Sequence, residues 1–282
     1  PTNHPQMLEP LSGGTMPVSL YFTQWLLVGI FTFALPQSVV RCMGYKDTKS
    51  LRGAMIGGTI IIGAMMIGVT ALGVLSAGVL TGDLASYGGS VDNIIPRTIV
   101  ETLPPWLAGV AIVGPVAASI STVSSLLIAS SSAIIKDLWL HYADDRGQQV
   151  SDAVVARSSQ IITLGVGVIV FVLAVVPPSV IWKINMFAFG GLETAFCWVL
   201  VGALFFKRAS KVGAIASMVG GTAVYCLCMA LGFKLFGLHQ IVIGITVSLL
   251  CMVIGSWIGN RRANAADAAA DAEMREVFFP EA

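Results

Sequence analysis

The chain has 282 residues, of which 56% are hydrophobic and only 11% are charged, and its formal net charge is +1. Soluble domains carry about 25% charged residues, so this composition excludes a surface that faces water on all sides and predicts the lipid bilayer as the solvent. The balanced charge, with no basic run among aromatic residues, excludes nucleic acid as a partner.

The sequence also lacks the motifs of enzyme chemistry. The three histidines are His4, His141 and His239, and none of them belongs to a metal-binding pair. No glycine-rich phosphate-binding loop precedes a helical segment, and the serine-rich patches have no evident histidine and aspartate partners. We therefore expect a protein that is not an enzyme.

Residues 1–17 form a segment without Lys or Arg that begins at Pro1 and has no signal-peptide pattern. We expect this segment to be an extracytoplasmic loop cut from a longer chain. We also expect that an N-terminal half of the same protein is absent from this sequence.

Seven apolar stretches are long enough to cross a bilayer, which takes about 20 residues of helix. In chain order they are residues 18–40, a part of 53–80, a part of 106–135, then 158–176, 184–206, 212–233 and 238–260. None alternates apolar and polar residues as a barrel strand does. The sequence therefore predicts an all-α membrane protein with seven transmembrane helices within residues 18–260, followed by a tail over 261–282.

The positive charges predict the orientation of these helices. Nearly all of the 16 Lys and Arg residues follow the first, third and fifth helices or lie in the tail. The opposite side holds only Arg97, Lys183 and Lys234. Because positive residues accumulate on the cytoplasmic side, we expect the N-terminal segment outside the plasma (inner) membrane and a cytoplasmic C-terminus.

The first apolar stretch contains Pro36, with Thr32 one turn earlier on the same face. Proline removes a backbone donor and frees a carbonyl in the preceding turn. Two interpretations are open at this point, namely a broken helix that lines a solute cavity and a simple kink near the cytoplasmic end.

The third stretch carries small and hydroxylated residues on one helical face. Ala118, Ser121, Thr122 and Ser125 follow the i, i+3, i+4, i+7 spacing. Hydroxyls and carbonyls loosened near Gly114-Pro115 would suit a small hard cation. The same residues also suit tight helix packing, so both interpretations stay open.

The fifth stretch contains Glu193, an ionisable residue at membrane depth, and Asn185 near its outer end. Intramembrane carboxyls are costly and commonly functional, although a buried structural pair is the alternative. Asn185 either contacts a polar ligand or lies in an interfacial loop.

Two glycine pairs show the four-residue spacing of close helix contacts. Gly53 and Gly57 lie in the second stretch, and Gly255 and Gly259 lie in the seventh. We expect both pairs to serve helix packing.

Several segments together resemble the sodium/solute symporter family. They are LPQSVVRCMGYKD at 35–47, AASIST at 117–122, SSAIIKDL at 131–138, FGGLE at 189–193 and FFKRA at 205–209. The resemblance implies a LeuT-type fold built from two inverted five-helix repeats. It makes the helices within 18–206 the second repeat and those within 212–260 peripheral.

The resemblance also implies site residues and a function. Ala118 matches a carbonyl ligand of Na⁺, and Ser121 and Thr122 match hydroxyl ligands. Thr32, Pro36 and Asn185 match positions that contact solute. The likeness is strongest to members that carry pantothenate, so we expect Na⁺-coupled import of pantothenate by alternating access. The alternatives are symport of proline, a sugar or another carboxylate, and a transporter-like membrane sensor domain.

Overall fold

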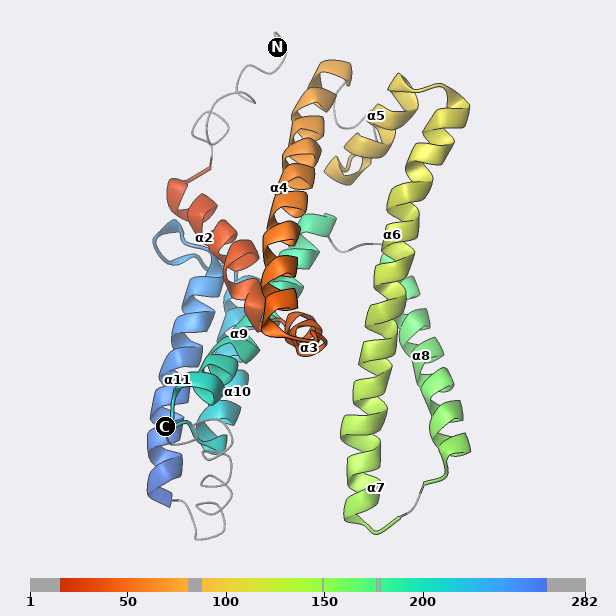
Figure 1. Ribbon diagram of the computed structural model, residues 1–282. Helices are drawn as coiled ribbons and strands as arrows, with labels where there is room; N and C mark the ends of the chain where they lie inside the picture. The colour runs from red at the N-terminus through yellow and green to blue at the C-terminus, as the bar shows by residue number, and fades with distance from the viewer. Residues whose placement is uncertain (1–15, 81–87, 149, 176, 178, 263–282) are drawn as a thin grey trace. The chain divides into compact units, whose positions relative to one another are not determined.

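The computed structural model describes residues 16–80, 88–148, 150–175, 177 and 179–262. Most of the expected loop over 1–17 and tail over 261–282 therefore lies outside the described residues. The described chain is helical and divides into two compact units. The first unit comprises residues 1–70 and 181–282, and the second comprises 71–180. Figure 1 labels the elements, and each unit is described by itself.

The first apolar stretch is a broken helix. Helix α2 (Val18–Gly29) gives way to a short 3-10 segment, η2 (Phe31–Ala34), and the chain resumes as α3 (Pro36–Met43). Leu35 between them is extended, with φ −66° and ψ 128°. Proline disfavours helical geometry in the residue before it and fits the first turn of a helix. The break therefore lies ahead of Pro36, and α3 starts at it.

Helix α4 (Thr48–Val79) follows, and the boundary between the two units falls within it. The carboxylate of Asp47 accepts a hydrogen bond from the backbone N–H of Ser50 at 2.6 Å, which caps the start of the helix. The hydrogen bonds from Ser50 lower the pKa of Asp47.

The rest of the first unit is a packed set of three spans. They are α9 (Ile181–Phe205), α10 (Lys211–Ala230) and α11 (Gln240–Arg262), with a 3-10 turn η6 (Leu235–Gly237) between the last two. Glycines allow the close approach of α10 and α11. A Cβ atom on Gly255 would lie 2.8 Å from the Cα of Gly213, and one on Gly259 would also crowd α10. The packing role expected for Gly255 and Gly259 is confirmed, whereas Gly53 and Gly57 have no described neighbour within 4 Å.

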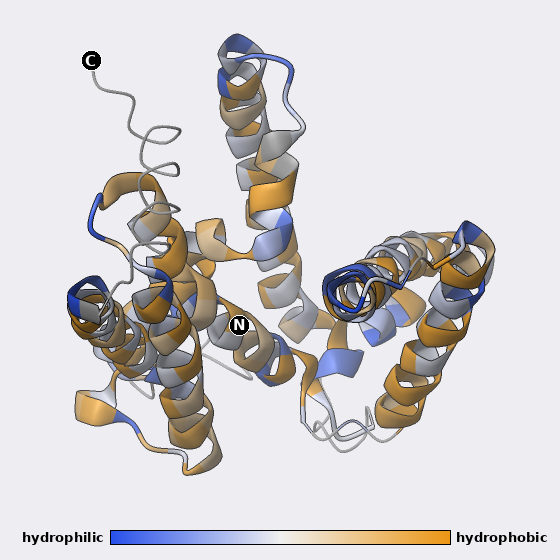
Figure 2. Ribbon diagram, turned by 90° about the horizontal axis from the view of Figure 1, so that it is seen from below, coloured by the Kyte–Doolittle hydropathy of each residue, from blue (hydrophilic) through white to orange (hydrophobic). Residues whose placement is uncertain are grey.

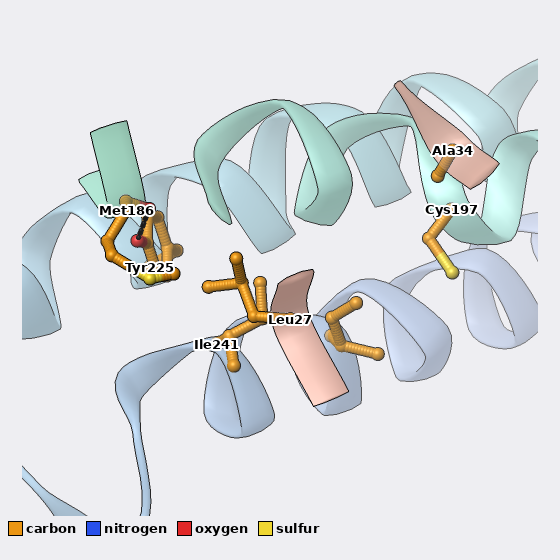
Figure 3. Close-up of a cluster of buried hydrophobic side chains, with 7 residues drawn as sticks. Leu27, Ala34, Met186, Cys197, Tyr225 and Ile241 are labelled. Carbon is orange, nitrogen blue, oxygen red and sulfur yellow. Dashed lines mark hydrogen bonds between the residues drawn. The ribbon is translucent and has the colours of Figure 1, made fainter. Parts of the chain in front are cut away.

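A buried apolar cluster joins α2 and η2 to this helix set (Figure 3). Its buried members are Leu27, Ala34, Met186, Cys197, Tyr225, Ile241 and Ile245. Polar side chains at its edge bond to the backbone, because lipid offers no alternative partner. Tyr225 Oη donates to the Met186 carbonyl at 3.0 Å, and Trp198 Nε1 donates to the Ile245 carbonyl at 2.9 Å.

His239 joins the start of α11 to α2, just outside the membrane-spanning segment. Its backbone N–H donates to Thr23 Oγ1 at 2.9 Å, and its ring Nδ1 accepts from the N–H of Ile241 at 3.2 Å. Burial lowers the pKa of His239 to about 4, and Lys234 contributes to the decrease. The ring is therefore neutral at pH 7 and keeps the lone pair that caps α11.

The second unit contains two long helices. After η4 (Val91–Asn93) and α5 (Ile94–Thr102), helix α6 (Pro105–Ser132) continues as a π-helix, η5 (Ala133–Leu140), and then as α7 (His141–Asp145). Helix α8 (Asp152–Val175) packs against α6, where Thr163 Oγ1 donates to Ser131 Oγ at 2.8 Å. Helix α6 runs unbroken through Pro115, so the loosening expected near Gly114-Pro115 does not interrupt it.

These elements confirm an all-α membrane protein. Six described helices are long and apolar enough to cross a membrane, and the shorter apolar run Val18–Ala34 is the seventh expected span. Figure 2 shows apolar residues along the long helices and hydrophilic residues gathered at many helix ends and connections.

A first prediction concerns the contact between α10 and α11. We expect Gly255→Ala to lower the free energy of unfolding by about 1–3 kcal/mol, because the added methyl meets the Gly213 backbone and the helices must separate. Gly191→Ala is the matched control, since its methyl makes an ordinary contact with Tyr225 at 4.0 Å. Thermal unfolding in lipid nanodiscs measures both, and equal melting temperatures would contradict the close contact.

A second prediction concerns acid. The pKa of His239 in the folded state is about 4, and that of an unperturbed histidine is about 6.5. The neutral ring thus contributes stability that is complete above about pH 6.5 and is lost as the pH falls towards 4, up to about 3 kcal/mol. We expect the melting temperature to fall over this window. His239→Asn keeps an acceptor that does not titrate, and an identical fall in that variant would exclude His239 as the cause.

Candidate functional site

The candidate cation ligands lie on one face of α6 in the second unit. Thr122 Oγ1 donates a hydrogen bond to the carbonyl of Ala118 at 3.0 Å, so these two oxygens are adjacent. One turn further, Ser125 Oγ donates to the carbonyl of Ser121 at 2.9 Å. The hydroxyls of Thr122 and Ser125 thus donate their hydrogens to carbonyls of the same helix, and their oxygen lone pairs remain available to a cation.

All of these residues are exposed within the described chain. Ala118, Ser121 and Thr122 together offer one carbonyl and two hydroxyl oxygens, whereas a hard cation takes about six oxygen ligands. If this face holds a cation, it supplies only part of the ligand set, and a second surface would have to supply the remaining oxygens. Across the described residues, no group of three or more His, Cys, Asp or Glu side chains could hold a metal ion.

The candidate solute positions lie in the first unit. Thr32 lies in η2, half-buried, and its carbonyl accepts from the N–H of Leu35 at 3.2 Å. Pro36, also half-buried, begins α3. Thr32 therefore lies in the non-α-helical turn, and Pro36 begins the helix that follows it, which is the break that the broken-helix interpretation expects.

Asn185 is exposed on the first turns of α9 and lies apart from that turn. Ala34 of η2 and Cys197 belong to one buried cluster and lie together in Figure 3. Twelve residues of helix between Asn185 and Cys197 correspond to about 18 Å. The structure does not bring Asn185 together with Thr32, because η2 packs much further along α9.

Glu193 lies in α9 between these two levels. It is 0% exposed, and neither carboxylate oxygen has a hydrogen-bond partner. The structural ion pair considered as an alternative for this residue is not present among the described residues.

Sequence reasoning missed a groove between α6, η5 and α8. It has a volume of about 530 Å³, and its polar lining is Ser131, Ser132, Lys136, Ser159, Gln160 and Thr163. Lys136 lies within the π-helix, a geometry that recurs at functional sites. The run of serines before Lys136 was the available signal, but only the packing of α8 turns it into a groove.

Comparison with known proteins gives consistent matches. The family model of the sodium:solute symporter family matches residues 3–221. A sodium/pantothenate symporter of Haemophilus influenzae is 36% identical over 92% of this chain and 52% of its own length, and that of Escherichia coli is 35% identical over the same shares. An osmoregulated proline transporter of Bacillus subtilis is 27% identical over 93% of this chain and 52% of its own length. No solved structure matches.

The chain spans about half the length of the curated relatives it matches. These relatives are transporters, and the sequence model of their family covers most of this chain, including α6 and the broken helix. The chain belongs to the sodium:solute symporter family.

Proposed function

We propose that this chain forms one half of a sodium-coupled symporter that carries pantothenate into the cell. The observation that supports pantothenate is the identity of 35–36% to two sodium/pantothenate symporters across 92% of the chain. The proline transporter that matches a similar share is 27% identical, which makes proline the weaker candidate.

The coupling ion in this proposal is Na⁺, held by the carbonyl of Ala118 and the hydroxyls of Ser121 and Thr122. The 3.0 Å contact between Thr122 Oγ1 and the Ala118 carbonyl supports it, because one ion can approach two oxygens at this separation. The remaining ligands would come from the rest of the transporter, which is the partner that this chain requires.

The solute in this proposal contacts the turn at Thr32 and Pro36. Irregular backbone at membrane depth is tolerated where it is buried or lines a cavity, and its carbonyls can bind a polar solute. Asn185, nearer the start of α9, would make a separate polar contact along the path rather than share the pocket of Thr32.

Transport would follow alternating access, in which Na⁺ binding favours solute binding and the two repeats rock around the sites. Thermodynamic linkage requires each ligand to raise the affinity of the other by the same factor. In the proposed orientation the N-terminal segment lies outside the plasma membrane and the C-terminus is cytoplasmic, in keeping with the positive residues after α3, α7 and α9.

A third prediction tests the sodium ligands. In the complete transporter, Ser121→Ala or Thr122→Ala should raise the Na⁺ concentration for half-maximal uptake about tenfold or more. Loss of one oxygen ligand to a charged species costs about 1.5–3 kcal/mol, and 1.4 kcal/mol corresponds to tenfold in affinity. Uptake of labelled solute as a function of Na⁺ concentration measures the change.

Ser124→Ala is the matched control for these variants. Ser124 Oγ donates to the Ile120 carbonyl at 2.8 Å, so it makes the same type of intrahelical bond from a different face of α6. We expect its Na⁺ dependence to stay unchanged. An equal effect of Ser124→Ala would mean that the hydroxyls act on the helix and not on the ion.

A fourth prediction tests the solute. Vesicles that contain the complete transporter should accumulate labelled pantothenate when an inward Na⁺ gradient is applied, and K⁺ in place of Na⁺ should abolish the uptake. A hundredfold excess of unlabelled pantothenate should compete, whereas the same excess of proline should not. If only proline competed, the transported solute would be proline and not pantothenate.

A further inference from the structure

Among the described residues, the buried side-chain oxygens that lack a hydrogen-bond partner all belong to two residues of the first unit. They are Glu193 of α9, through both carboxylate oxygens, and Thr222 of α10, through Oγ1. Buried polar groups in proteins are otherwise nearly always paired. The proposed sodium and solute sites make no use of either side chain.

The register of α9 and α10 brings these two residues to one level. The two helices are antiparallel neighbours joined by the short connection of residues 206–210. A Cβ atom on Gly190 would lie 2.6 Å from Tyr225 Cζ, so Gly190 and Tyr225 oppose each other. Glu193 lies three residues after Gly190 on α9, and Thr222 lies three residues before Tyr225 on α10. Because the helices are antiparallel, both residues lie at the same distance, and in the same direction, from that contact.

Along α9 and α10, every Lys and Arg lies ten or more residues from Glu193 and from Thr222. On α9 the nearest is Lys183, ten residues away or about 15 Å along the helix, and on α10 it is Lys211, eleven residues from Thr222. Residues 240–260 of α11, and all of α2 and η2, contain no charged residue. The titratable neighbours are Cys197 on α9 and Tyr225 on α10, which lie close enough to interact electrostatically with Glu193. Cys226 follows Tyr225 in the chain.

An ionised carboxylate in this position would be a buried charge without a countercharge. Such a charge costs several kcal/mol even after relaxation, and buried groups avoid this cost by taking up a proton. A neutral carboxyl has one O–H donor, and the hydroxyl of Thr222 is an acceptor. A bound proton removes the buried charge. The two side chains are not hydrogen-bonded to each other as they stand, and a change of rotamer would let the carboxyl O–H reach Thr222 Oγ1.

We propose that Glu193 is a proton-binding site, whose carboxyl is neutral in the folded protein. The proton comes from water when the chain folds, and it returns to water when the interface opens. This inference concerns the folded protein and does not rest on the identity of the transported solute. Because the folded chain binds a proton that an exposed glutamate releases above about pH 4.3, the free energy of unfolding falls as the pH rises.

Infrared spectroscopy of the complete transporter in lipid nanodiscs tests the proposal directly. At pH 7 we expect the carbonyl-stretch band of a protonated carboxylic acid, and we expect Glu193→Gln to abolish it. Glu193→Asp should keep a band at a shifted frequency. The matched control is Glu101→Gln, the same chemical change on an exposed residue of α5, which should leave the band unchanged.

Thermal unfolding provides the second readout. Between pH 6 and 9 the wild-type melting temperature should fall, whereas that of Glu193→Gln should stay level and close to the wild-type value at pH 6. The rival is an ion pair with a cation from the other half of the transporter. A missing carbonyl band at pH 7, or a Glu193→Gln variant that unfolds at pH 6, would support that ion pair and overturn the proton site.

Discussion

Within a bilayer, every polar group has to find its partner in the protein itself, and this constraint accounts for most of the structure. It explains why hydroxyls on the long helices donate to carbonyls four residues earlier, as Thr59, Thr70, Thr122 and Thr246 do. It also explains why Tyr225 and Trp198 direct their donors at main-chain carbonyls on neighbouring segments. A side chain that departs from this rule, as Glu193 does, therefore marks a position where something other than packing determines the residue.

The same constraint limits where the backbone can break. Residues 30–35 leave the α-helical pattern, and the carbonyls of Ile30 and Thr32 accept from N–H groups three residues later instead of four. The break is covered by tertiary packing, since Ala34 and Leu35 are buried and η2 lies against α9. Two prolines lie in contrasting positions. Pro36 starts a helix beside a packed turn, whereas Pro115 lies inside a helix that continues through it.

Hydropathy alone predicted the spans, because a helix that crosses a bilayer needs about 20 apolar residues. The fifth stretch, for example, was expected at 184–206 and is α9 at Ile181–Phe205. Hydropathy could not place the features that depend on packing. The composition of Ala133–Leu140 does not distinguish a π-helix from an α-helix. The separation of Asn185 from Thr32 follows from the register between η2 and α9. The face of Ala118, Ser121 and Thr122 was predictable from spacing, which left packing and ion binding both open, and the family resemblance favours ion binding.

The chemistry of that face suits an ion that has to leave as well as bind. A carbonyl and two hydroxyls carry no formal charge, so in the proposed site they would replace part of the hydration shell of Na⁺ without adding a countercharge. Conduction and transport both require binding strong enough to admit an ion and weak enough to release it. Because Thr122 donates to the Ala118 carbonyl, these two oxygens are paired with each other when no ion is bound. In the proposed mechanism the affinity for Na⁺ would depend on how closely a second surface approaches, and alternating access would vary this distance.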